Sequence, residues 1–238
     1  MKRTPIKIGE TIATIIAEEE YFSVAEQEVR EQRKALETFI LRDPFFLTTF
    51  EPYSVPVDAP LIIKKMAEVS QMTGVGPMAA VAGAIAEFVV KAMVKAGAEF
   101  AVFDNGGDIA LFIDRPIILG VYSGHQKLNQ LGFKVQPRDH ILGICTSSRT
   151  VGHSISLGQT DASVVISPDV ILADATATAL GNRITIKNEA AIKQTMKEMM
   201  INGIEGMLVI VDELIGLIGD LPPIVKANVE VDLITKGS

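Results

Sequence analysis

Two pairs of short apolar runs, each pair joined by a tight polar turn, constrain most strongly what this chain can fold into. EFAVF and IALFI flank the turn DNGGD at residues 104–108, and MLVIV and LIGLI flank Asp212 and Glu213. Short apolar runs around such a turn are typical of antiparallel hairpins. Asn105-Gly106 also favours a turn whose two central residues both have positive φ. The sequence therefore predicts at least two β-hairpins.

Helical patterns precede each hairpin. Residues 61–72 and 75–98 come before the first hairpin, and Pro77 falls in the first turn of the second segment, where proline is tolerated. Residues 173–182 and 189–201 come before the second hairpin. This repeated order of helix, helix and hairpin predicts an internal duplication, in which each half gives two antiparallel strands to a common sheet backed by helices.

The rest of the chain is expected to fit the same α+β architecture. We predict an opening strand or hairpin around Gly9, an amphipathic helix over residues 24–41 and a loop over residues 127–140. PIILGVYS and ILGICTSS are predicted to be strands, and the three phenylalanines of DPFFLTTFEP are predicted to plug the core. Since no low-complexity linker interrupts the chain, we expect one domain over residues 1–238.

Composition and charge argue against several classes of function. The 238 residues are 48% hydrophobic and 21% charged, with a net charge of −7, which argues against a nucleic-acid or anionic-membrane partner. The single cysteine cannot form an intramolecular disulfide, and the N-terminus has no apolar run followed by a cleavage site. We therefore expect a soluble, cytoplasmic protein, in which an apolar sheet edge or helix face would support a homo-oligomer.

Potentially reactive side chains are concentrated in residues 141–183. Asp174 and Thr178 are four residues apart, so on a helix both would project from one face. A carboxylate and a hydroxyl on one face suit Mg²⁺, which takes oxygen ligands and usually keeps waters and substrate phosphates. Spacing alone favours the plainer alternative, in which Asp174 stabilises the helix N-terminus and Thr178 packs.

Cys145 and His153 also leave alternatives open. The apolar neighbours of Cys145 favour a buried, inert thiol, and the competing hypothesis is a nucleophile or sulfur carrier whose thiolate is helped by His153. His153 is either a ligand-binding or acid–base residue or a polar strand residue. The DNGGD segment is either a simple turn or a place where the backbone approaches a ligand closely.

Taken in order, these motifs resemble the ApbE superfamily, whose best-known members are FAD:protein FMN transferases. The matching segments are Asn105-Gly106-Gly107-Asp108-Ile109 with the family's GGD segment, Thr146-Ser147-Ser148 with its Thr-Ser-Gly turn, His153 with the histidine that follows, and Ala173-Asp174 with Thr178-Ala179 as its Ala-Asp-x-x-x-Thr-Ala metal segment. The whole string is more similar still to a cytosolic branch of that superfamily. Ser148 stands where the transferases have glycine, and the residues after His153 do not continue into Ile-Asp-Pro.

The resemblance implies a single ApbE-like domain with a T-fold-like antiparallel sheet. It implies FAD or FMN in a cleft, contacted by residues 105–108 and 146–148, and Mg²⁺ at Asp174 and Thr178. The implied reaction is Mg²⁺-dependent transfer of FMN to a protein acceptor, or cleavage of the FAD pyrophosphate. Asp174 and His153 would be the catalytic residues of that reaction, and Cys145 would be catalytic in the sulfur-handling alternative. The alternatives are a cytosolic sulfur-assimilation protein that carries a persulfide on Cys145 and a non-catalytic ligand-binding protein on the same fold.

Overall fold

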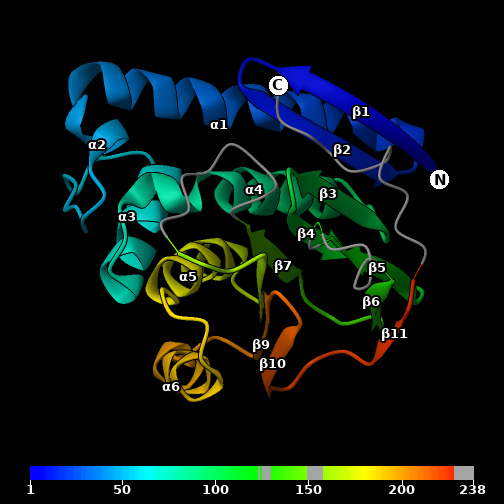
Figure 1. Ribbon diagram of the computed structural model, residues 1–238. Coiled ribbons are helices and arrows are strands. Elements are labelled where there is room, and N and C mark those ends of the chain that lie inside the picture. Colours follow the sequence, from blue (N-terminus) through cyan, green and yellow to red (C-terminus); the bar gives the residue numbers. More distant parts are fainter. Residues whose placement is uncertain (123, 125–129, 149–157, 228–238) are drawn as a thin grey trace.

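The computed structural model describes residues 1–122, 124, 130–148 and 158–227 (Figure 1). An eight-stranded antiparallel sheet runs in the order β1-β2-β3-β4-β7-β8-β9-β10, and a three-stranded sheet in the order β11-β6-β5. The strands are β1 (Lys2–Ile8), β2 (Thr11–Ala17), β3 (Ala101–Asn105), β4 (Asp108–Phe112), β5 (Ile117–Val121), β6 (Leu131–Val135), β7 (Leu142–Ser147), β8 (Ala162–Ser167), β9 (Gly206–Val211), β10 (Leu214–Gly219) and β11 (Ile224–Lys226). The helices are α1 (Phe22–Arg42), α2 (Phe45–Thr48), α3 (Leu61–Thr73), α4 (Val81–Lys95), α5 (Val170–Arg183) and α6 (Glu189–Met199), with the short 3₁₀ helices η1 (Glu19–Tyr21) and η2 (Pro77–Ala80).

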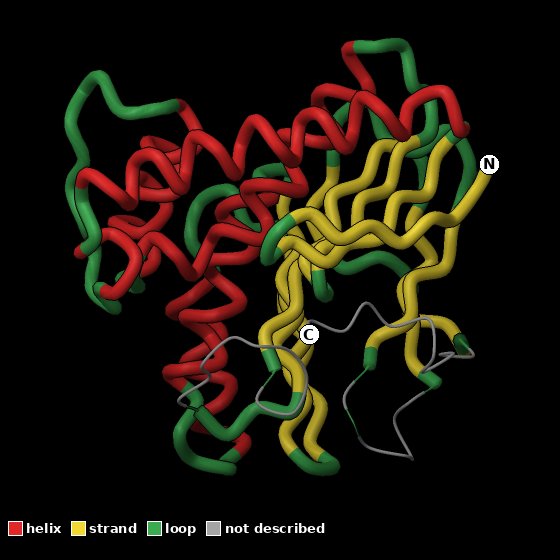
Figure 2. The backbone as a smooth tube through the Cα atoms, turned by 90° about the horizontal axis from the view of Figure 1, so that it is seen from above, coloured by secondary structure: helices red, strands yellow, loops and turns green. Residues whose placement is uncertain are grey.

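The large sheet is the middle one of three layers. The helices pack against one face and the small sheet against the other, and a separate apolar cluster fills each interface. Val102 and Phe103 are neighbours on β3 and belong to opposite clusters, because successive side chains of a strand point to opposite faces. Figure 2 shows the helices gathered on one side of the curved sheet. Both faces of the central strands are therefore buried.

The predicted α+β architecture is confirmed, with the opening hairpin around Gly9 and both later hairpins in the large sheet. The two later hairpins are separated by β7 and β8 in that sheet. The internal duplication stays a prediction, and so does the assignment of residues 1–238 to one domain.

The structure corrects two local predictions, which are the position of the first hairpin turn and the continuity of the helix over residues 75–98. The first hairpin turn is Gly106-Gly107, with φ of 72° and 103°, so it lies one residue later than the predicted Asn105-Gly106 turn. Asn105 instead ends β3 and pairs with Asp108, because two adjacent glycines adopt positive φ at less cost than asparagine. The predicted helix over residues 75–98 is divided into η2 and α4, and the backbone leaves the helical region at Ala80.

Two further predictions were wrong in part. The predicted loop over residues 127–140 contains strand β6. Its apolar side chains alternate along the chain over only five residues, and the residues on either side are polar, so the segment was mistaken for a loop. Of the three phenylalanines in the predicted core plug, only Phe46 is fully buried, while Phe45 and Phe50 are exposed. The segment Pro77–Lys95 is apolar and long enough to cross a membrane, but 56% of it is buried in the fold. It packs against α5, β3 and β4 as a core helix.

Candidate functional site

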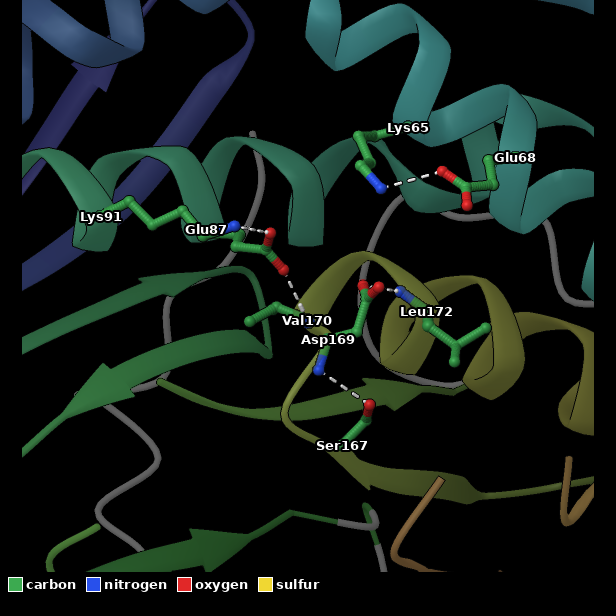
Figure 3. Close-up of polar contacts among 8 residues, drawn as sticks. All are labelled: Lys65, Glu68, Glu87, Lys91, Ser167, Asp169, Val170 and Leu172. Carbon is green, nitrogen blue, oxygen red and sulfur yellow. Dashed lines mark hydrogen bonds and ion pairs between the residues drawn. The ribbon is translucent and has the colours of Figure 1, made fainter. Parts of the chain in front are cut away.

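Helices α4 and α5 cross at a place where each one caps the other. The amide of Gly83, in the first turn of α4, donates to Asp174 Oδ2 at 2.7 Å. The amide of Val170, at the start of α5, donates to Glu87 Oε2 at 2.8 Å (Figure 3). Amides in the first turn of a helix have no acceptor within that helix. The two carboxylates therefore satisfy donors that would otherwise be buried without partners.

The close approach of the two helices depends on Gly83. A Cβ at this position would lie 2.7 Å from the Asp174 Cβ and 2.8 Å from the Val170 carbonyl oxygen. Asp174 therefore does stabilise a helix N-terminus, but that of α4. The cap of its own helix is Asp169, whose Oδ1 accepts from the Leu172 amide at 2.9 Å (Figure 3).

Charged side chains surround this crossing. Glu87 is almost fully buried and pairs with the exposed Lys91 on the same helix, and Lys65 pairs with Glu68 on α3 (Figure 3). The hydrogen bond to Glu68 is the main reason why the pKa of Lys65 is raised, with smaller contributions from the carboxylates of Asp169 and Glu87. The start of α5 is thus a region in which acidic side chains outnumber basic ones.

Three aspartates, Asp104, Asp108 and Asp174, form what we call the acid site. Asp108 begins β4 directly opposite Cys145 of β7, and its Oδ1 is buried without a hydrogen-bond partner among the described residues. Burial, then the nearby carboxylates of Asp174 and Asp104, raise the pKa of Asp108 well above its usual range. Burial raises the pKa of Asp174 to about 7, although the amides of Gly83 and Ala82 act in the opposite direction. Two buried carboxyl groups with raised pKa values make a site that favours a cation or a proton.

Cys145 lies beside the acid site with a fully buried side chain. Its thiol donates to the Val170 carbonyl oxygen, with Sγ 3.6 Å away. Burial, together with the charges of Asp108 and Asp174, raises the pKa of the thiol well above its usual range. Because the thiolate is the nucleophilic form, these surroundings favour the inert thiol over the persulfide carrier.

The remaining predicted site residues fall into two groups. Near the acid site, the Asn105 side chain donates to the Ala82 carbonyl oxygen at 3.0 Å, and the Gly107 amide donates to Asp104 Oδ1 at 3.0 Å. Thr146 also lies near the acid site, because the Thr146 carbonyl oxygen would be 3.8 Å from a Cβ added to Gly107. Gly106 has open space around it, and Thr178 is half-buried on α5, one turn after Asp174.

Ser147 and Ser148 lie elsewhere, near the C-terminal end of α5. The Ser147 Oγ would be 3.6 Å from a Cβ on Gly181, and the Ser148 Oγ donates to the Asp161 carbonyl oxygen at 2.6 Å. The buried hydroxyls of Thr160 and Ser163, which have no hydrogen-bond partner among the residues that the structure describes, lie beside the same glycine. His153 falls outside the described residues.

Sequence reasoning missed Gly83 and Glu87. Glu87 is the only acidic residue in the apolar segment over residues 75–98, and a single acid in such a helix was a usable signal of a buried role. Gly83 lies among several alanines in the same segment, and nothing in that local pattern distinguishes it. Its partner Asp174 is 91 residues away, which no local pattern indicates.

The described residues offer only part of a metal site. Among them, no three His, Cys, Asp or Glu side chains lie close enough together to hold a metal ion. A cation here would therefore rely on one or two carboxylates, together with hydroxyl, water or phosphate oxygens. A surface cavity of about 320 Å³ lies between α1 and Pro60, and none of its lining residues belongs to the acid site.

Comparison with solved structures defines the class of fold. The chain shares the ApbE fold with the flavinyl transferase ApbE of Pseudomonas stutzeri in its apo form, with a TM-score of 0.58, 11% identity and coverage of 100% of this chain and 97% of that one. A variant of the flavin transferase ApbE of Vibrio cholerae matches with a TM-score of 0.55 and 13% identity, over 92% and 96% of the two chains. The expected ApbE-like fold is thereby confirmed.

Comparison of sequences then gives the family. Residues 2–203 match the family described as AbpE bacteria, and the chain belongs to that family. It is 48% identical to a UPF0280 protein of Methanocella arvoryzae, over 99% of this chain and 96% of that protein. It is 43% identical to a UPF0280 protein of Archaeoglobus fulgidus, over the full length of both.

Proposed function

We propose that the protein binds a flavin nucleotide together with Mg²⁺ and acts on the nucleotide diphosphate, either as an FMN transferase or as an FAD pyrophosphate-cleaving enzyme. The observation that carries the proposal is the acid site, in which Asp108, whose Oδ1 atom is buried, and the buried Asp174 both have raised pKa values. The flavin in the proposal is inferred from the two proteins that share the fold, which are named as a flavin transferase and a flavinyl transferase.

The side chains at the acid site fit Mg²⁺. The buried Asp108 Oδ1 has no hydrogen-bond partner in the part of the chain that the structure describes, Asp174 is held in place by the Gly83 amide, and the Thr178 hydroxyl lies one turn further along α5. Oxygen donors and few carboxylates are typical of Mg²⁺ sites that are completed by water and substrate phosphates. When bound, Mg²⁺ would neutralise phosphate charge and polarise the phosphoryl oxygens.

The chain's own residues would prepare this site in three ways. Asp174 must lose a proton before it can bind a cation, and its hydrogen bond to Gly83 fixes the direction of the carboxylate. The Gly106-Gly107 turn leaves open space in which the backbone can approach a ligand. An overall charge of −7 disfavours direct binding of a diphosphate, and a cation or backbone amides would offset that repulsion.

Other parts of the proposal follow from the family resemblance. We assign flavin contacts to Asn105, to Asp108 and to residues 146–148, and acid–base chemistry to His153. A cytoplasmic location and a protein acceptor for FMN belong to the same proposal.

The proposal is tested by titration calorimetry of FAD, with and without MgCl₂, on the native chain and on Asp174→Asn. Asparagine keeps an oxygen that can accept from the Gly83 amide, so the variant removes charge and leaves the cap of α4. The native chain should bind FAD only with Mg²⁺, and Asp174→Asn should weaken binding at least tenfold. Asp58→Asn, an exposed acid outside the site, is the matched control and should bind as the native chain does.

Product analysis separates catalysis from binding. Incubation with FAD and Mg²⁺ should release AMP, with FMN either free or attached to protein. Mg²⁺-dependent binding without AMP release would identify a non-catalytic binding protein. FAD affinity that is independent of Mg²⁺, or equal in the native chain and Asp174→Asn, would refute the proposed metal site.

A further inference from the structure

The eight-stranded sheet has two edges that differ in chemistry. One edge is β1, which carries Lys2, Arg3, Pro5 and Lys7, and such charges and prolines block pairing with another chain. The other edge is β10, with the sequence LIGLIG, which contains neither a charge nor a proline. No described strand pairs with the outer side of β10. An uncharged edge of this kind is a template for a further strand.

Side chains on both faces of β10 are exposed at this edge. Gly216 faces α6, because a Cβ there would lie 2.8 Å from the Met196 Sδ. Ile215 and Leu217 point to the opposite face and are 43% and 51% exposed, while Leu214 is 39% exposed. Ile215 and Leu217 therefore form an exposed apolar pair on one face of this edge, and Leu214 adds an exposed aliphatic side chain on the other.

The alternation of hydrogen bonds between β10 and β9 determines which backbone groups of β10 face away from β9. Val211 pairs with Leu214 across a two-residue turn, and the Asp220 amide donates to the Glu205 carbonyl oxygen at 2.7 Å. Because hydrogen-bonded and non-hydrogen-bonded positions alternate in antiparallel pairs, the even-numbered residues of β10 bond to β9. The amides and carbonyls of Ile215 and Leu217 therefore point away from the sheet.

This alternation allows β10 to pair with a second copy of itself. With a two-fold axis at Gly216, Ile215 of one copy lies opposite Leu217 of the other, and Leu214 lies opposite Ile218. The outward amides and carbonyls of Ile215 and Leu217 then meet each other, as antiparallel pairing requires. The same two residues form a cluster of four aliphatic side chains on the face away from α6.

The charges around β10 are compatible with this pairing. Glu213 falls opposite the partner's Gly219, so no two acids face each other within the paired stretch. Asp212 falls opposite the partner's Asp220, just outside that stretch, and is already paired with Lys187 at 2.6 Å. A pairing of five residues per copy buries less than the roughly 800 Å² that each partner gives to a standard interface. A dimer of micromolar affinity is therefore expected.

We propose that β10 is a homodimerisation edge, which joins two large sheets into one continuous antiparallel sheet across a two-fold axis at Gly216. The test is sedimentation equilibrium of the full chain between about 1 and 200 µM. The native chain should shift from monomer to dimer across this range. Leu217→Lys places a charge in the aliphatic cluster and should weaken dimerisation at least tenfold. Ile118→Lys, at an equally exposed isoleucine of β5, is the matched control and should dimerise as the native chain does.

Amide hydrogen exchange at low and high protein concentration distinguishes strand pairing from other modes of dimerisation. The amides of Ile215 and Leu217 should become protected at high concentration. Ile215→Lys is measured in parallel, so that one charged variant remains if thermal melting shows the other to be unfolded. A monomer at every concentration would overturn the proposal. So would a dimer that both lysine variants leave intact, or one in which the β10 amides stay unprotected.

Discussion

Replacing Asp174 with asparagine should raise the free energy of unfolding of the metal-free protein, by an amount that grows from pH 5 to pH 8. Burial raises the pKa of Asp174 from 3.8 to about 7 in the folded chain. Between these two values the folded chain holds a proton that the unfolded chain has lost. The stability contributed by this neutral carboxyl group is fully present below about pH 4 and is lost as the pH rises through 7. Asparagine has no carboxyl to ionise and so avoids this loss.

The magnitude follows from the size of the pKa shift. One pKa unit corresponds to about 1.4 kcal/mol. From pH 5 to pH 8 the folded Asp174 passes from almost fully protonated to almost fully ionised, so the advantage of asparagine should grow by about 2 to 3 kcal/mol. Asp108 takes part in the same titration, which spreads the change over a wider pH range.

Urea denaturation of the native chain and Asp174→Asn in EDTA at pH 5, 6, 7 and 8 measures this difference. Asp58→Asn is the control, and its stability should run parallel to that of the native chain at every pH. Adding Mg²⁺ at pH 8 should stabilise the native chain and leave Asp174→Asn almost unchanged, since a ligand stabilises only the state that binds it. If the free energies of unfolding of the native chain and Asp174→Asn change with pH in parallel, Asp174 is not a buried carboxyl group that ionises near pH 7.

Two further predictions concern the neighbours of Asp174. Gly83→Ala should destabilise the protein by about 1 to 3 kcal/mol in urea denaturation, because its Cβ would overlap Asp174 and the Val170 carbonyl; Ala92→Gly, at a half-buried position of α4, measures the propensity difference between alanine and glycine without that overlap. A stability of Gly83→Ala equal to that of the native chain would contradict the close helix crossing. The Cys145 thiol should react with a thiol reagent only when the chain unfolds, and stoichiometric labelling of the folded protein within minutes would restore the sulfur-carrier hypothesis.

Most of the large sheet and its helical cover could be predicted from the sequence, because the hairpins are encoded locally by apolar runs around short turns, although β8 was not predicted. In the small sheet only β5 was predicted, as the strand PIILGVYS, and the pairing within that sheet was not. Its strand β6 is five residues long in a polar stretch, and one of its partners, β11, follows almost a hundred residues later. Pairing between such distant short segments leaves no periodic signal.

The candidate site was predictable to a similar degree. The family motifs led to Asp108 and Asp174, and the apolar surroundings of Cys145 correctly indicated burial. The contact that holds Asp174 in place was not predictable, because its partner is a backbone amide and any residue except proline has one. The role of Asp174 at the start of α4 therefore required the assembled fold.

The reciprocal caps between α4 and α5 also set an order in which the molecule can assemble. The two contacts join residues that are 91 and 83 positions apart, so each closes a long loop of chain. Contacts of such high sequence separation form late, since the entropy of loop closure must be overcome before they contribute. A nascent chain that has not yet reached α5 therefore has an α4 whose Gly83 amide lacks its Asp174 acceptor and bonds to water instead. Cleavage anywhere between residues 108 and 174 would leave Asp104 and Asp108 on one fragment and Asp174 on the other, and so divide the acid site.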